Sequence, residues 1–130
     1  MSTLEKILYV EDDPDIRSIA EIALQDIGGF TVSMCGSGCE AMDVAAEFGA
    51  QLILMDVMMP DMDGPTTLLE LRKLLECAET PVIFLTAKTL RHEIDNYDTL
   101  GAIATISKPF NPMKLAEQVR QIWSDQNFTS

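Results

Sequence analysis

Five polar residues of the chain stand at the ends of apolar runs, where a parallel sheet would bring them to one edge. They are Glu11 and Asp12 after the first run, Asp56 after the third, Thr86 after the fourth and Lys108 after the fifth. Carboxylates packed within a few ångströms repel one another, and one must hold a proton unless a cation intervenes. An all-oxygen cluster suits a hard cation, and two or three carboxylates with room for waters favour Mg²⁺ over a Ca²⁺ cage.

A phosphoryl group is the ligand that would use all of these groups. Its oxygens bind Mg²⁺, an ammonium such as that of Lys108 and a hydroxyl donor such as Thr86. A carboxylate in the middle of the cluster could also act as its nucleophile and form an acyl phosphate. Asp56 is the central candidate, because it ends the middle strand of the expected sheet.

The elements that must position these residues alternate along the chain. Apolar runs predict strands at residues 7–10, 30–34, 51–56, 81–86 and 102–107, and the amphipathic stretches between and after them predict five helices. Strict alternation of this kind predicts an α/β fold, a doubly wound parallel sheet with helices on both faces. Sites in such sheets form outside the carboxyl ends of the strands, which is where the polar residues stand.

Caps and apolar faces indicate where the helices lie. Asp13 and Pro14 begin the first helix, a weaker polar helix covers about residues 88–100, and Asn111 and Pro112 begin the last. The expected apolar faces are Ile16, Ile19, Ala20, Ala23, Leu24 and Ile27 on the first helix, Leu68, Leu71 and Leu75 on the third, and Leu115, Val119, Ile122 and Trp123 on the last. Residues 126–130 are expected to form a frayed tail.

Length and charge limit the classes of function. The chain has 130 residues, enough for one domain, and its 9 Lys and Arg against 21 Asp and Glu give a formal net charge of −12. So acidic a surface repels phosphate backbones and anionic membranes, which predicts no nucleic-acid and no membrane partner. We find no targeting segment or membrane span and expect a cytoplasmic protein whose three cysteines are reduced thiols.

Four motifs together carry a family resemblance. They lie at residues 7–13, 54–64, 81–87 and 108–110, each at a strand end and in one register. Over roughly residues 4–125 the sequence resembles a receiver domain of bacterial two-component response regulators, of the stand-alone chemotaxis-regulator (CheY-like) type. The resemblance implies a flavodoxin-like sheet of five strands in the order 2-1-3-4-5, flanked by five helices. It also implies a single receiver domain over residues 1–130.

The resemblance implies a role for each residue of the pocket. Asp56 would accept the phosphoryl group from a histidine kinase or phosphotransfer protein, and Thr86 would hydrogen-bond that group once it is bound. Lys108 would pair with Asp56 and then with the phosphoryl group, and the Lys108–Pro109 peptide bond would be cis. The chain would be a signalling switch rather than an enzyme, catalysing only its own phosphoryl transfer and a slow autodephosphorylation.

The resemblance also implies Mg²⁺ as the cofactor. Asp12 and Asp56 would bind the ion, Glu11 would act mainly through ordered water, and Met58 would contribute its backbone carbonyl. Met58 and Lys88 stand at the two positions that tune acyl-phosphate hydrolysis in the family. An apolar Met58 cannot orient an attacking water as an amide could, so we expect a long-lived phosphoryl state.

Two departures from the family pattern bear on the output. Thr105 stands where the family usually has an aromatic residue that rotates inward on activation, so signalling is expected to rest on shifts of the fourth helix and fifth strand. Ala102-Ile103-Ala104 lacks the acidic pair that helps many receivers dimerise, which favours a monomer or weak dimer. We expect the downstream protein to bind the face formed by the fourth helix, fifth strand and fifth helix.

Three other functions fit parts of the sequence. Asp61, Asp63, Gly64 and Glu70 have the spacing of four positions of a calcium-binding loop, but the residues before them form an apolar strand. A phosphatase with an aspartyl nucleophile would need an acid where Met58 stands. A receiver that binds partners without phosphorylation would be expected to lack pocket residues, and all of them are present.

Overall fold

The computed structural model describes residues 3–60, 62–86 and 102–129. The described strands are β1 (Lys6–Val10), β2 (Thr31–Cys35), β3 (Leu52–Asp56), β4 (Val82–Thr86) and β5 (Ala102–Ser107). They form one parallel sheet in the order β2-β1-β3-β4-β5, which confirms the predicted fold class and strand order. Each strand lies within one residue of its predicted bounds.

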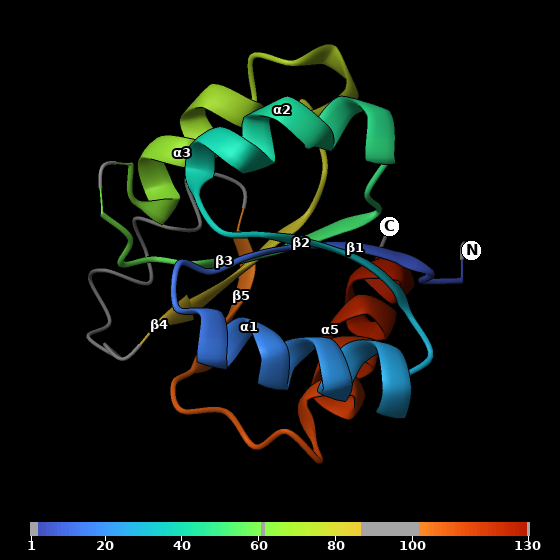
Figure 1. Ribbon diagram of the computed structural model, residues 1–130. Helices are drawn as coiled ribbons and strands as arrows, with labels where there is room; N and C mark the ends of the chain where they lie inside the picture. The colour runs from blue at the N-terminus through green and yellow to red at the C-terminus, as the bar shows by residue number, and fades with distance from the viewer. Residues whose placement is uncertain (1–2, 61, 87–101, 130) are drawn as a thin grey trace.

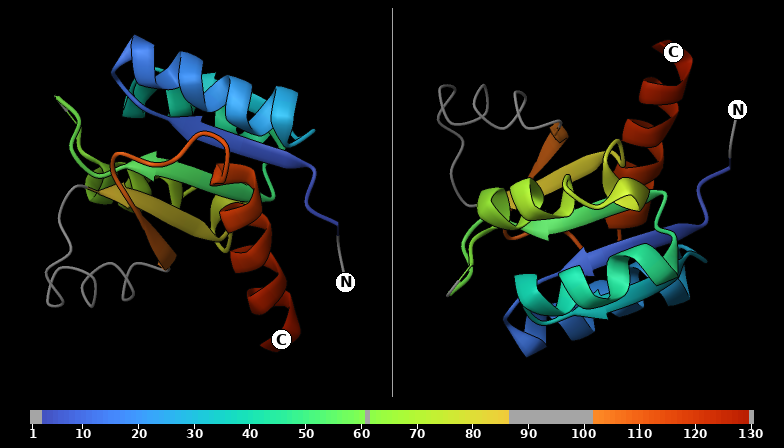
Figure 2. Two further views of the ribbon diagram at one scale, coloured as in Figure 1. Left: turned by 90° about the horizontal axis from the view of Figure 1, so that it is seen from below. Right: turned by 90° about the horizontal axis from the view of Figure 1, so that it is seen from above.

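Helices cover both faces of this sheet (Figure 1). They are α1 (Pro14–Glu21), which continues as a π-helical segment over Ile22–Ile27, α2 (Gly38–Phe48), α3 (Gly64–Leu71) and α5 (Leu115–Thr129). The pair α1 and α5 lies on one face and the pair α2 and α3 on the other (Figures 1 and 2). The predicted fourth helix, at about residues 88–100, lies outside the described residues.

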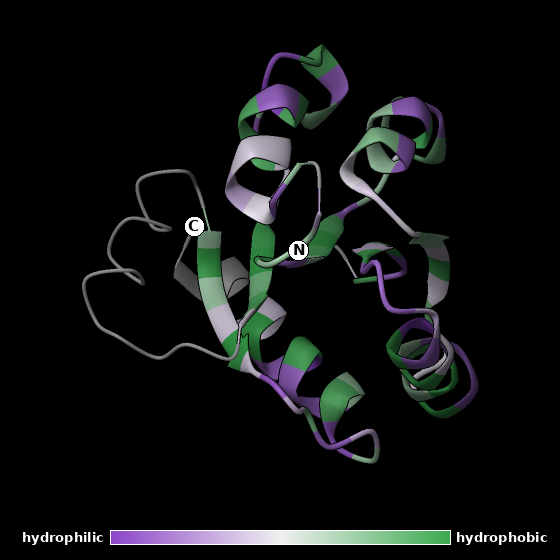
Figure 3. Ribbon diagram, turned by 60° about the vertical axis from the view of Figure 1, so that its left-hand side comes forward, coloured by the Kyte–Doolittle hydropathy of each residue, from purple (hydrophilic) through white to green (hydrophobic). Residues whose placement is uncertain are grey.

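Alternate strand residues supply two apolar cores, one on each face of the sheet. Leu8, Ile53 and Phe84 pack toward α2 and α3, whereas Ile7, Leu54 and Ile83 pack toward α1 and α5. Every residue of β3 and β4 is buried, as expected of strands covered on both faces. Figure 3 shows strands that are largely apolar and helices of mixed polarity. None of the helices in the described part of the chain is both long and apolar enough to cross a membrane.

The first helix buries a narrower stripe than its sequence predicts. Ala20, Ala23 and Leu24 are buried, but Ile19 and Ile27 are 43% and 46% exposed. The predicted face spans more of the helix circumference than one packing partner can cover, and the π-helical turn at Ile22–Ile27 changes the angular spacing of the later residues.

The third helix ends earlier than predicted. Leu71 is its last residue, and Leu75 is 89% exposed in a 3₁₀ turn rather than part of the apolar face. The cause is a side-chain contact: Arg72 Nη1 donates to the backbone oxygens of Cys77 and Thr80, at 2.8 and 2.6 Å. These bonds fold the chain back toward β4 and leave Leu75 on the outside of the turn.

The last helix is shifted toward the C-terminus. Residues 112–114 form a turn, and α5 begins at Leu115 and continues to Thr129. The prediction of a frayed tail is therefore wrong for residues 126–129. No Gly or Pro interrupts this segment, and Gln121 Nε2 donates to Asp125 Oδ1 at 2.9 Å, an i, i+4 contact that supports the last turns.

Candidate functional site

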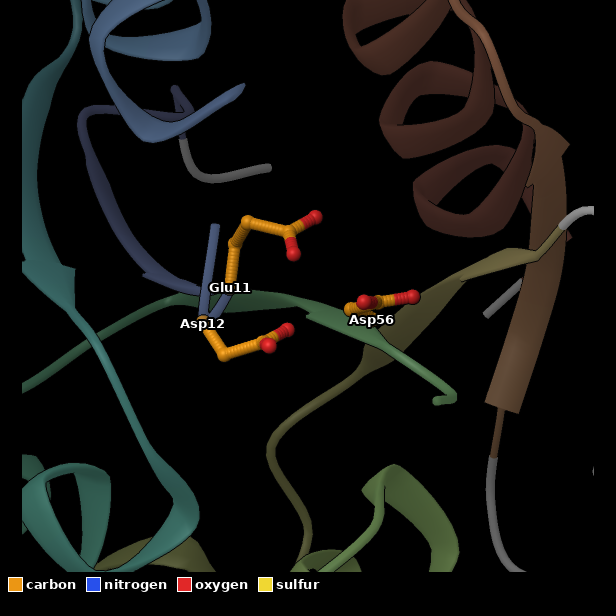
Figure 4. Close-up of side chains that lie close together, drawn as sticks. All are labelled: Glu11, Asp12 and Asp56. Carbon is orange, nitrogen blue, oxygen red and sulfur yellow. The ribbon is translucent and has the colours of Figure 1, made fainter. Parts of the chain in front are cut away.

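The carboxyl ends of β1 and β3 bring three acidic side chains together. Glu11 and Asp12 follow β1, and Asp56 ends the neighbouring β3. One oxygen from each lies within 4.8 Å of the others, and the close-up view shows the three side chains near one another at the two strand ends (Figure 4). Glu11 and Asp56 are buried, with 1% and 3% of their surface exposed. The cluster is thus the one that the sequence predicts.

Lys108 inserts its ammonium between the two buried carboxylates. Its Nζ lies 3.0 Å from Glu11 Oε1 and 3.2 Å from Asp56 Oδ2. The backbone anchors this residue as well, because Lys108 N donates to the Thr86 oxygen at 2.9 Å. The Lys108–Pro109 peptide bond is cis, as predicted. The lysine reaches the acids from β5 across the end of β4, so that four strands contribute to one pocket edge.

Burial and neighbouring charges shift the pKa values of Glu11 and Lys108. Burial, together with the nearby Asp56, raises the pKa of Glu11 to about 7, against the lowering effects of Lys108 and the Asp13 amide. Burial alone would lower the pKa of Lys108, but its contacts with Glu11 and Asp56 raise it overall. Three carboxylates face one ammonium, so two negative charges remain when all are ionised. That excess is what a single divalent cation would balance.

The oxygen donors therefore fit a hard cation. The three acids present only oxygen, they stand close enough for their oxygens to share one ion, and Asp12 is partly open to solvent and hence to bound water. Glu11, Asp12 and Asp56 are the acids that the sequence analysis assigns to a cation site.

The loop after β3 and the start of α3 pack closely against the backbone of Asp56 and Val57. Gly64, the first residue of α3, lies so close that a Cβ there would be 2.5 Å from the Asp56 backbone oxygen and 3.0 Å from Val57 Cα. Gly64 N also donates to the Val57 oxygen at 2.9 Å. The Met58 amide approaches Asp56 Oδ1 at 3.4 Å, while the Met58 side chain is 64% exposed. Met58 therefore touches the site through its backbone and leaves its thioether in solvent.

Two acids near the pocket have purely local roles. Asp13 Oδ1 accepts from Asp15 N at 2.9 Å and caps α1, as predicted. Asp63 Oδ1 accepts from Thr66 N at 2.8 Å and caps α3. Because α3 already begins at Gly64, residues 64–70 cannot form the second half of a calcium-binding loop.

Thr86 and Thr105 lie on adjacent strands beyond Asp56. Thr86 is buried at the end of β4, one position past the Asp56–Leu85 pair of the β3–β4 ladder. Thr105 pairs with Phe84 across β4 and β5 and is half-buried. It borders a hollow of about 400 Å³ that is otherwise lined by Ile106 and by side chains from Lys114 to Ile122. A small side chain thus stands beside open space on the β5–α5 face.

Two further residues of the site were not predicted from the sequence. Arg17 Nη1 donates to the backbone oxygens of Glu11 and Asp12, and its one sequence signal is a cation in the first turn of a helix, where the dipole disfavours it. Tyr9 is fully buried on β1, and its hydroxyl has no hydrogen-bond partner among the residues that the structure describes. Burial, followed by the charges of Glu11 and Asp56, raises the pKa of Tyr9 well above its usual value.

The fold and this pocket agree with the family to which the sequence corresponds. The model of the response regulator receiver domain matches residues 7–120. The chain belongs to the response regulator receiver family. Receiver domains are signalling modules of two-component systems and bind Mg²⁺ at an acidic active site.

Curated relatives include whole regulators of about twice this length. The receiver is 35% identical over 125 residues to response regulator Rre1 of Synechocystis sp., covering 95% of this chain and 54% of Rre1. It is 37% identical over 130 residues to the transcriptional regulatory protein CpxR of Escherichia coli, covering 95% of this chain and 53% of CpxR. The chain thus spans about half the length of the curated relatives that it matches.

Solved receiver structures superpose over nearly the whole chain. Chemotaxis protein CheY4 of Vibrio cholerae gives a TM-score of 0.85 at 30% identity, over 92% of this chain and 99% of CheY4. The receiver domain of sensor histidine kinase PA1611 from Pseudomonas aeruginosa gives a TM-score of 0.78 at 30% identity, over 93% of this chain and 98% of that one. The PA1611 structure carries a magnesium ion in its active-site cleft.

Proposed function

We propose that this receiver is a phosphorylation-dependent switch that takes a phosphoryl group onto Asp56. The donor is the phosphohistidine of a histidine kinase or phosphotransfer protein. The transfer starts from a phosphohistidine whose second ring nitrogen carries a proton: the N–P bond breaks, an Asp56 carboxylate oxygen bonds to phosphorus, and neutral imidazole leaves. The observation that carries the proposal is the half-buried Lys108 ammonium, held 3.0 and 3.2 Å from Glu11 and Asp56 beside a third acid.

The residues of the pocket have complementary tasks in this proposal. Asp56 is the nucleophile, and Lys108 holds it in place before transfer and pairs with a phosphoryl oxygen afterwards. The Thr86 hydroxyl donates to a second phosphoryl oxygen. Because Asp56 is 3% exposed, bulk water has little access to the acyl phosphate that forms.

We assign the Mg²⁺ ligands to the same edge of the sheet. Asp12 and Asp56 would bind the ion directly, Glu11 through ordered water, and Met58 through its backbone carbonyl. When bound, Mg²⁺ neutralises the charge of the acids and of the incoming phosphoryl oxygens. The two negative charges left by three carboxylates and one ammonium support this assignment.

The output is assigned to a protein contact on the face formed by the fourth helix, β5 and α5. Phosphorylation would change the affinity of this face for a downstream protein, with the receiver acting as a monomer or weak dimer in the cytoplasm. The half-buried Thr105 beside a hollow supports a surface that reshapes without an aromatic rotamer switch. The relatives include transcriptional regulators, but the acidic charge of this chain predicts that it does not itself bind nucleic acid.

The proposal is tested by incubating the protein with Mg²⁺ and a small-molecule phosphoryl donor and weighing it by mass spectrometry. Wild type should gain one phosphoryl group, and Asp56→Asn should gain none. Asp63→Asn is the matched control, because it changes an exposed aspartate of the same loop, and it should be labelled like wild type. Labelling of the Asp56→Asn variant at another residue would overturn the assignment.

A further inference from the structure

The Arg17 guanidinium joins α1 to the backbone that carries two of the three acids. A single nitrogen, Nη1, donates to the Glu11 oxygen at 2.8 Å and to the Asp12 oxygen at 3.1 Å. These oxygens belong to successive peptide units, so the bonds fix the orientation of two adjacent peptide planes. The Cα of Asp12 joins the two planes, and the Cα of Glu11 lies at the outer edge of the first one. The direction of the Glu11 and Asp12 side chains therefore depends on where Arg17 holds the loop.

The Arg17 guanidinium lies directly against the turn that follows β2. A Cβ added at Gly36 would lie 2.9 Å from Arg17 Nη1 and 3.4 Å from its Cζ, so the turn after β2 leaves no room for a side chain there. That turn is itself fixed, because Gly36 N donates to Glu40 Oε1 at 2.7 Å. Glu11 N in turn donates to the Cys35 oxygen at 3.0 Å. The Arg17 head is thus enclosed between the loop after β1 and the turn after β2.

We propose that Arg17 is a positioning residue for the Mg²⁺ site, which it serves by holding the Glu11–Asp12 backbone. This inference rests on the metal assignment of the proposed function. Groups that orient metal ligands typically change metal affinity by about 10- to 100-fold when they are lost. The two carbonyl contacts lie at the ligand residues themselves, so we expect the loss of Arg17 to weaken Mg²⁺ binding about tenfold.

Charge and geometry predict opposite effects here, which makes the sign of the change decisive. The arginine is a fixed positive charge near a cation site, so through charge alone its removal would tighten Mg²⁺ binding. If Arg17 acts by positioning the loop, its removal weakens binding despite the lost repulsion. A variant that binds Mg²⁺ more weakly than wild type therefore points to geometry.

The experiment titrates MgCl₂ into ¹⁵N-labelled protein and follows the backbone amide NMR signals of residues 11–13. Arg17→Ala should raise the Mg²⁺ dissociation constant about tenfold, and Arg17→Lys, which can reach one carbonyl, should give an intermediate value. Arg72→Ala is the matched control. Arg72 is half-buried like Arg17 and also clamps two carbonyls through Nη1, but at the other end of the sheet. It should lose thermal stability and keep the wild-type Mg²⁺ affinity.

Gly36→Ala tests the same idea with the charge retained. The new methyl group would lie only 2.9 Å from the present position of Nη1, so the flexible guanidinium would have to move, which should also weaken Mg²⁺ binding. This variant decides the question if Arg17→Ala fails to fold. Unchanged or tighter Mg²⁺ binding in Arg17→Ala or Gly36→Ala would overturn the inference and leave the proposed function intact. A wild-type protein whose amides at residues 11–13 do not respond to MgCl₂ would instead refute the metal assignment.

Discussion

At the scale of single residues, the site is an arrangement of charges that no part of the chain could hold alone. Glu11 and Asp56 are almost fully buried, and isolated buried carboxylates would take up protons. Lys108 compensates one charge, and both Glu11 oxygens have partners, because Oε2 also accepts from Asp13 N at 3.2 Å. The negative charge that Lys108 does not compensate favours the binding of a cation. The raised pKa of Glu11 makes the pocket responsive to pH.

The first prediction concerns the pH dependence of stability without metal. The pKa of Glu11 is about 7 in the folded chain and 4.5 in the reference state, so between these values the folded protein binds more protons than the unfolded one. The contribution of Glu11 to stability is therefore fully present below pH 4.5 and is lost as the pH rises to about 7.

Glu11→Gln removes this titration. Measured in EDTA, the melting temperature of the variant should gain on that of wild type as the pH rises from 4.5 to 7. Glu47→Gln, at an exposed glutamate of α2, is the control. A constant difference in melting temperature between wild type and Glu11→Gln across this range would contradict the prediction.

The second prediction concerns Met58 and the lifetime of the phosphoryl state. The Met58 side chain is 64% exposed beside the rim of the pocket and carries no group that could hold a water for attack on phosphorus. Met58→Asn would supply an amide at this position, and the acyl phosphate should then decay faster than in wild type. Loss of the phosphoryl group is followed by mass spectrometry after removal of the donor. Equal decay rates in the two proteins would argue against a role for this side chain.

At the scale of elements, the site depends on how closely α3 approaches the end of β3. Gly64 makes this approach possible, because its missing Cβ leaves space for the Asp56 oxygen and for Val57 Cα. The neighbouring elements supply further restraints: the Asp63 cap fixes the start of α3, and Arg17 connects α1 to the acidic loop. The position of Asp56 is thus set by the starts of α1 and α3 as much as by the strand that carries it.

The third prediction follows from this close approach. Gly64→Ala places a methyl group 2.5 Å from the backbone oxygen of Asp56, a rigid neighbour that cannot yield as a flexible side chain would. We expect a loss of about 1–3 kcal/mol in the free energy of unfolding and slower phosphorylation of Asp56. Urea unfolding and the rate of labelling measure the two effects. Gly29→Ala, where the added Cβ meets no atom within 4 Å, is the control, with strain only from its positive φ of 78°.

At the scale of the whole molecule, the acidic charge is mostly a surface property. The pocket accounts for only two of the 12 net negative charges, and one Mg²⁺ would balance those two. The remainder is spread over the rest of the chain and gives it a field that repels polyanions. Relatives that are transcriptional regulators are about twice as long, so the matched receiver region is only about half of each of them.

The fourth prediction tests this field. The chain as given should not shift a DNA duplex in a gel even at about 50 mM salt, where electrostatic binding of proteins to DNA is strong. A phosphoryl group on Asp56 adds negative charge and should not change this result. Binding that weakens as salt is added would contradict the prediction, because it would reveal a basic surface that the net charge conceals.

The sequence by itself determined the fold and the identity of the central pocket residues. Both follow from one rule: polar residues that directly follow apolar runs come to one edge when parallel strands align. Glu11, Asp12, Asp56 and Lys108 obey this rule and do meet. The cap at Asp13 is equally local and was predicted from an aspartate that directly precedes Pro14, whereas the cap at Asp63 was not predicted.

Only the tertiary structure decided which side chains cross between elements. Hydrophobic periodicity gives no signature for the contacts of Arg17 with the Glu11 and Asp12 carbonyls or for the exposure of Leu75. Each depends on how a long side chain or a loop packs against a neighbour that is remote in sequence or lies around a turn. Periodicity shows which face of an element is buried, but the length and direction of a side chain acquire meaning only when its neighbour is in place.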